Sequence, residues 1–174
     1  MIGDLSRRSV LSLATGAALL LVSAPAEATT LQTPKGKPIL RIGGKITEHN
    51  VGDEAVFDID GLAALGTKTF TTSTPWTDKV ATWEGVLLSV LMDAVGATGT
   101  IIRATALNDY VVDVPMQGLR EEGGILAMCR DGKPMPISDK GPLFILYPFD
   151  GDAALRQQSV YMRCAWQIAR LDVI

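Results

Sequence analysis

The sequence has few of the residues that build metal sites and nucleophilic triads. It contains one histidine, His49, and two cysteines, Cys129 and Cys164. Zinc sites draw their ligands mainly from these residue types, so a zinc site of standard composition is excluded. A Ser-His-Asp triad would have to use His49, and no Gly-x-Ser-x-Gly motif accompanies it. We therefore assign His49 no role.

The sequence also has no large excess of either charge sign and few long apolar runs. Lysine and arginine total 16 against 19 aspartates and glutamates, and the net charge is −3. No basic cluster interrupts this balance, so nucleic acid is not expected as a partner. The longest apolar run, residues 10–22, is shorter than the roughly 20 residues that a membrane-spanning helix needs.

That apolar run belongs to a segment with the layout of an export signal, residues 1–28. Arg7 and Arg8 precede it, and the small-x-small pattern Ala26-Glu27-Ala28 follows it. The pattern predicts cleavage after Ala28, which would leave residues 29–174 in the periplasm. The run Ser-Arg-Arg-Ser-Val-Leu-Ser resembles a twin-arginine signal, with the general secretory route and an uncleaved anchor as alternatives.

Residues 29–174 read as one domain in which short strands outnumber helices. The apolar spacing of residues 85–96 predicts a helix that ends at Gly96, and residues 61–65 predict a shorter one capped by Asp58 or Asp60. Residues 151–158 predict a helical turn. The expected strands are two within 38–50, then 54–59, 67–74, 100–107, 110–115, 125–130, 143–148 and 164–174. This pattern indicates a β-rich α+β domain.

Cys129 and Cys164 both fall in segments that we interpret as strands. An exported protein meets an oxidising compartment, where a disulfide can form. Nothing in their spacing requires the bridge, so the sequence leaves it open.

Five segments in order resemble the molybdopterin-binding domain of the sulfite oxidase family. They are "WEGVLLSVLMDAVG" from Trp83, "ALNDYVVDVP" from Ala106, "ILAMCRDGKPM" from Ile125, "KGPLFILYP" from Lys140 and "WQIARL" from Trp166. The resemblance covers about residues 38–174. It implies the sulfite oxidase fold, with mixed sheets and a few short helices. Met135 and Ala165 depart from the family pattern, which usually has a leucine and a basic residue there.

A second departure concerns the metal. The family holds its molybdenum cofactor with one cysteine thiolate that precedes the Trp-x-Gly motif. The matching position here is Ser73, with Thr72 and Thr74 beside it, and an alcohol is a far weaker ligand than a soft thiolate. Molybdenum is therefore not expected.

The sequence resembles most a short, cysteine-less branch of the family that carries Thr-x-Thr-Pro-Trp-Thr, here residues 72–77. This resemblance implies a non-catalytic periplasmic protein that binds a reduced or molybdopterin-like pterin. It also implies a partner, the periplasmic domain of a membrane-bound cyclic-di-GMP enzyme (a diguanylate cyclase or phosphodiesterase). The alternatives are a molybdopterin-dependent oxidoreductase subunit with an unusual ligand, and a scaffold whose pocket is empty.

Each candidate pterin-binding residue also has an ordinary structural interpretation. The Trp76 ring would stack on the pterin, or it simply packs. Asp109 would accept from the amino edge of the pterin, or it serves the turn between two strands. Arg163 would meet an anionic group, or it is a solvated charge. The full predicted set is Thr72, Ser73, Thr74, Trp76, Asn108, Asp109, Tyr110 and Arg163. Trp83 and Trp166 are expected in the core.

Overall fold

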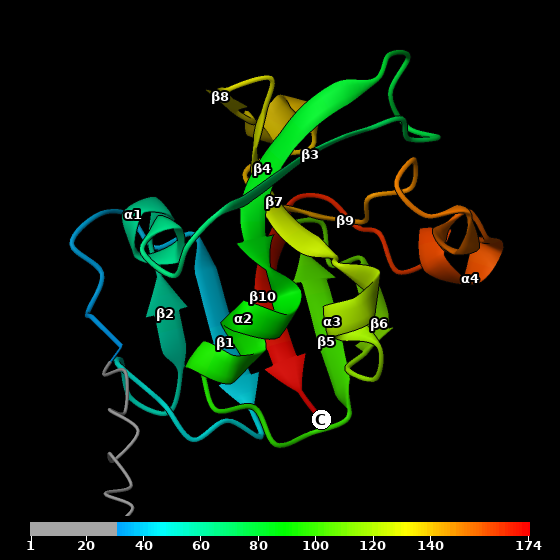
Figure 1. Cartoon of the computed structure of the whole chain (residues 1–174). Coiled ribbons are helices and arrows are strands. Elements are labelled where there is room, and N and C mark those ends of the chain that lie inside the picture. Colours follow the sequence, from blue (N-terminus) through cyan, green and yellow to red (C-terminus); the bar gives the residue numbers. More distant parts are fainter. Residues whose placement is uncertain (1–30) are drawn as a thin grey trace, which may run out of the picture.

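The computed structural model describes residues 31–174, which form two β-sheets and a few short helices (Figure 1). The predicted export signal, residues 1–28, lies outside the described residues. No helix within 31–174 has both the length and the apolar character to cross a membrane. The β-rich α+β class expected from the sequence is what the structure has.

The first sheet joins the two ends of the described chain. Its strand order is β2-β1-β10-β5-β6. The first strand, β1, pairs in parallel with the last, β10, and the other neighbours are antiparallel. The bounds are β1 Leu40–Gly44, β2 Ala55–Phe57, β5 Ile101–Ala106, β6 Val111–Pro115 and β10 Ile168–Val173.

The second sheet carries the strand that leads into the hydroxyl-rich segment. Its order is β3-β4-β7-β8, and β9 also pairs with β7. All of its pairings are antiparallel. The bounds are β3 Lys68–Thr72, β4 Ala81–Leu87, β7 Ile125–Arg130, β8 Lys133–Pro134 and β9 Phe144–Leu146.

Short helices fill the connections. The bounds are α1 Ile59–Ala63, α2 Leu88–Ala94, α3 Leu119–Glu122 and α4 Gln158–Tyr161, with 3₁₀ turns η1 Ile137–Asp139 and η2 Ala153–Leu155. Asp58 caps α1, because its Oδ1 accepts from the Gly61 N–H at 2.7 Å. Asp60 lies inside the helix, so its assignment as a cap is wrong.

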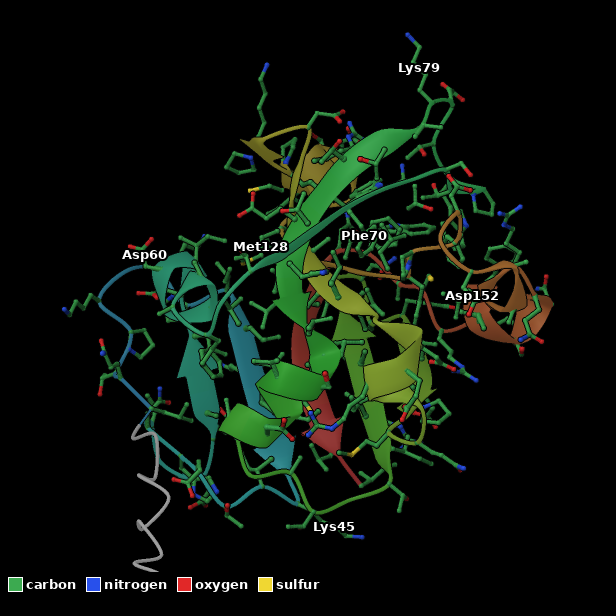
Figure 2. All side chains as sticks on the ribbon, viewed as in Figure 1. Lys45, Asp60, Phe70, Lys79, Met128 and Asp152 are labelled. Atoms are coloured by element: carbon green, nitrogen blue, oxygen red, sulfur yellow. The ribbon has the colours of Figure 1, made fainter. Side chains whose placement is uncertain are left out.

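The core lies where the apolar faces of the two sheets and α2 meet. Trp83 of β4, Leu91 of α2 and Phe144 of β9 are fully buried there. Charged side chains such as Lys45 and Lys79 extend outward from this core in Figure 2. Burying large aromatic and aliphatic side chains is the main favourable contribution to folding, so this region holds the domain together.

Three local predictions were wrong. Residues 85–87, predicted as the start of a helix, belong to β4, and α2 begins at Leu88. No second strand follows Gly44 within residues 45–50. The last strand begins at Ile168 rather than Cys164, because Gln167 adopts a left-handed backbone (φ 57°) that interrupts the extended chain. Of residues 164–167, Trp166 forms only an isolated bridge, to Phe144. The question left open on the cysteines is answered: Cys129 and Cys164 are both free thiols.

Candidate functional site

A cavity of about 510 Å³ opens beside the irregular segments of the chain. Its walls come from the turn after β3, the β5–β6 hairpin, α4, and the segment between α4 and β10. Figure 1 shows α4 at the edge of the molecule, away from the paired strands of both sheets. The lining residues are Pro75, Trp76, Asn108, Tyr110, Gln158, Tyr161, Met162, Cys164, Ala165 and Trp166.

Trp76 is the aromatic centre of this site. Its ring lies 6.0 Å from Tyr161, 6.2 Å from Trp166 and 6.0 Å from Phe144, measured between centroids. All three pairs are edge-to-face, the arrangement that aromatic quadrupoles favour. These contacts fix the Trp76 ring from several sides while it still lines the cavity. The prediction of a ligand-facing Trp76 is therefore compatible with its surroundings, although stacking itself remains a prediction.

Trp166 lines the same cavity and is 37% exposed. Its prediction as a core residue is wrong, whereas Trp83 is fully buried as expected. The difference follows from the chain around Trp166, which is irregular and turns at Gln167 before β10 begins. A side chain on such a segment is not held to the inward-facing alternation of a strand.

Among residues 31–174, no charged side chain lines the cavity. Its polar groups are the amides of Asn108 and Gln158, the hydroxyls of Tyr110 and Tyr161, and the Cys164 thiol. Amides and hydroxyls can donate and accept hydrogen bonds without a counter-charge. Taking an ion out of water is costly unless it is paired. The wall therefore suits an uncharged planar ring with polar edges better than an anion.

The hydroxyls of Thr72 and Ser73 bind a loop of the protein itself. The Asp150 carboxylate accepts from the Ser73 N–H at 2.6 Å and from the Ser73 hydroxyl at 2.8 Å. The Asp150 N–H donates to Thr72 Oγ1 at 3.0 Å. These hydrogen bonds, chiefly that from the Ser73 backbone, lower the pKa of Asp150 below its ordinary value. We call this reciprocal set the Asp150 latch.

Thr74 shapes the turn that presents Trp76. Its hydroxyl lies 2.8 Å from the Thr77 hydroxyl and accepts from the Trp76 N–H at 3.2 Å. Such a local hydrogen bond from a hydroxyl to the backbone two residues on is a common turn device. Thr72, Ser73 and Thr74 do not line this cavity. Their role in pterin binding is untested.

The β5–β6 hairpin contributes two of its three predicted residues. Asn108 and Tyr110 line the cavity. Asp109 does not; it occupies the left-handed position of the turn (φ 63°), and its N–H donates to the Ala106 carbonyl at 3.1 Å. Asn108 Oδ1 accepts from the Tyr110 N–H at 3.3 Å. Asp109 thus has the turn role that Asx residues commonly take.

Arg163 points to a structural partner. Its Nη1 donates to both Glu122 oxygens, at 2.8 and 2.9 Å, and both side chains are about four-fifths buried. The pair lies beside the buried Tyr147 hydroxyl. Arg163 is not on the cavity wall, and its proposed contact with an anion is untested.

Cys164 places a thiol on the cavity wall. It is not the position that the resemblance matches to the metal-binding cysteine of the family, which is Ser73. The Cys164 Sγ lies 3.7 Å from the Val160 carbonyl, and burial raises the pKa of the thiol. Soft metals bind the thiolate, so a thiol held protonated is a poor ligand. Within residues 31–174, no three His, Cys, Asp or Glu side chains gather as a metal site would require.

Sequence reasoning missed the wall that α4 and its flanks supply. Gln158, Tyr161 and Met162 line the cavity, and none was predicted. The available signal was the density of amide, aromatic and sulfur side chains in "QQSVYMRCAW", residues 157–166. That segment was interpreted mainly through its arginines.

The described residues form a strand-rich α+β domain whose fold is similar to that of a solved sulfane dehydrogenase. A crystal structure of the sulfane dehydrogenase SoxCD from Paracoccus pantotrophus matches it with a TM-score of 0.57 and 17% sequence identity. The match covers 77% of this chain and 37% of that one, so this chain spans little more than a third of its neighbour. No protein-family model matches the sequence, and no curated protein does either. At this identity the likeness shows a shared fold.

Proposed function

We propose that this protein binds a free, reduced pterin in the cavity beside Trp76, without molybdenum and without catalysing a reaction. The observation that carries the proposal is the uncharged, aromatic wall of a cavity of about 510 Å³. Ligand sites of roughly 300–1,000 Å³ with a few placed polar groups are typical for small molecules. A pterin is planar, offers a face to an aromatic ring, and presents amide-like edges to Asn108 and Gln158.

The Trp76 ring is the proposed stacking surface. It is half-buried and held edge-on by Tyr161 and Trp166, so little conformational freedom is lost when a ligand arrives. The lining side chains themselves are uncharged, and Lys140 Nζ lies 5.9 Å from the centroid of the Trp166 ring.

The absence of catalysis is proposed from the chemistry of position 73. Ser73 stands where the resemblance places the metal-binding cysteine, and its hydroxyl is already committed to Asp150. The Cys164 thiol is buried and its pKa is raised, which disfavours the thiolate.

The proposal extends to location and partner. The export-type residues 1–28 support a periplasmic protein. The mouth of the cavity is rimmed by Tyr110 and Met162, which are 55% and 63% exposed. A partner that covers this rim would sense whether the cavity is filled. We propose the periplasmic domain of a membrane-bound cyclic-di-GMP enzyme in that role.

Anaerobic titration with a tetrahydropterin, followed by calorimetry or tryptophan quenching, tests the binding claim. Trp76→Ala should weaken binding by roughly tenfold to a hundredfold, since stacking is worth about 1–3 kcal/mol. Thr69→Ala, on the exposed side of β3, is a matched control that should bind as wild type. Absence of binding by the wild type at millimolar ligand would reject the proposal. Stoichiometric molybdenum in protein purified from its own periplasm would instead support an oxidoreductase.

A further inference from the structure

The methionines differ sharply in their exposure. Met92, Met128 and Met135 are buried, with exposed fractions of 5% or less, and Met116 is half-buried. Met162 is 63% exposed, more than any other large apolar side chain in residues 31–174. Oxidation of a thioether requires that the oxidant reach the sulfur. Exposure therefore singles out Met162 among the described methionines.

Met162 also lies at the proposed binding site. It directly follows α4, and its side chain forms part of the cavity wall together with Tyr161 and Trp166. A side chain that lines the cavity and is also largely exposed to solvent lies at the mouth of the cavity. Methionine is flexible and apolar, and its sulfur makes favourable contacts with aromatic rings. A polar atom added to this sulfur would change the wall itself.

The two thiols are weaker competitors for an oxidant. The thiolate is the reactive form of cysteine. Burial raises the pKa of Cys164 and, together with the nearby Glu84 charge, that of Cys129. Cys164 is in addition almost inaccessible, with 6% exposure. Cys164 is therefore protected, Cys129 is half-buried, and Met162 is the most exposed sulfur-containing side chain in residues 31–174.

We propose that Met162 is a site of reversible oxidation, and that its sulfoxide lowers the affinity of the cavity for its ligand. The oxidant is a peroxide or a hypohalous acid. With hydrogen peroxide, the sulfur takes one oxygen atom, the O–O bond breaks, and water leaves; the sulfur loses two electrons and the peroxide gains them. The sulfoxide is polar and chiral, and methionine sulfoxide reductases restore the thioether. The effect on affinity rests on the proposed pterin binding, whereas the modification does not.

Peptide mapping by mass spectrometry after brief treatment with dilute hydrogen peroxide tests the modification. The peptide that contains Met162 should gain one oxygen before those that contain Met116 or the buried methionines. Tryptophan emission should change on oxidation of the wild type and of Met116→Leu, but not of Met162→Leu, because Trp166 lines the same cavity. Oxidation of Met162 no faster than of Met128 would overturn the proposal.

Tetrahydropterin titration of the treated proteins, after removal of the oxidant, tests the effect on affinity. Treated wild type should bind roughly two- to tenfold more weakly than untreated, the range expected if the sulfoxide cannot make a sulfur–aromatic contact with the pterin ring. Treated Met162→Leu should bind as untreated Met162→Leu. Equal affinity of treated and untreated wild type would overturn the proposal that the sulfoxide lowers ligand affinity. If untreated wild type binds no pterin, the proposed function fails, and the peptide map and emission still decide the modification.

Discussion

Two tryptophans seven residues apart show how differently the two parts of this molecule are built. Trp83 lies in β4, is fully buried, and packs on Phe144 with ring centroids 5.6 Å apart. Trp76 lies in a turn, is half-buried, and approaches the same Phe144 at 6.0 Å. Phe144 thus separates the core from the cavity. The core is made by regular strands, and the cavity is made by the segments that leave them.

The comparison predicts a large difference in stability between two alanine variants. Trp83→Ala should lower the free energy of unfolding by about 3–5 kcal/mol, because it removes a large ring from a close-packed core. Trp166→Ala should cost well under half of that, since its ring is 37% exposed. Urea denaturation measures both. Similar losses would show that the cavity wall is as important to folding as the core.

Trp83→Phe sharpens this prediction. Trp83 Nε1 is buried and has no hydrogen-bond partner within residues 31–174. Phenylalanine therefore removes volume without breaking a hydrogen bond, and its cost should fall clearly below that of alanine. A cost equal to that of Trp83→Ala would point to a polar contact of the indole instead.

A smaller effect should distinguish two neighbours in the β5–β6 hairpin. Asn108→Ala should weaken tetrahydropterin binding by roughly two- to tenfold, the worth of one ordinary hydrogen bond. Asp109→Gly should leave affinity unchanged, because glycine adopts the left-handed turn freely and Asp109 is not on the wall. Calorimetry of both variants decides. The reverse order would support the carboxylate role that the sequence suggested for Asp109.

The smallest expected effect concerns the Asp150 latch, which joins the turn of Trp76 to the loop before α4. Hydrogen bonds from Ser73 lower the pKa of Asp150 in the folded protein. This carboxylate thus contributes stability above its unfolded pKa, and the contribution is lost as pH falls through the lowered folded value, below about pH 4. Asp150→Asn should therefore be less stable than wild type at neutral pH and approach it in acid.

Thermal unfolding as a function of pH measures this convergence. Asp78→Asn is a matched control, because Asp78 is exposed and no side-chain hydrogen bond to it is found among residues 31–174. A constant difference between wild type and Asp150→Asn down to the acid limit would contradict the latch as a titrating contact.

Sequence patterns predicted the core better than the cavity for a physical reason. The apolar spacing around Leu91 and the alternation in β5 are local; the structure confirms that strand, and it confirms a helix there that begins at Leu88, three residues later than predicted. The partner of Ser73 lies 77 residues away in the sequence, and that of Arg163 lies 41 away. Hydroxyls and arginines have many equally good partners, so no local pattern selects Asp150 or Glu122. Of the candidate wall, the sequence predicted Trp76 from the hydroxyl-rich segment, and Asn108 and Tyr110 from a turn signal.

The parallel pairing of β1 with β10 constrains how the chain can be made. Since β10 lies between β1 and β5, the middle of the first sheet is filled by residues 168–173. A nascent chain on the ribosome has β1 available early. Its neighbour on the inner side of the sheet, β10, is missing until almost all of the described residues have emerged. Contacts so distant in sequence slow folding, because the loop must close before the pairing stabilises it. Fragments that stop before Ile168 should thus stay largely unfolded by circular dichroism, because they lack the central strand of the first sheet.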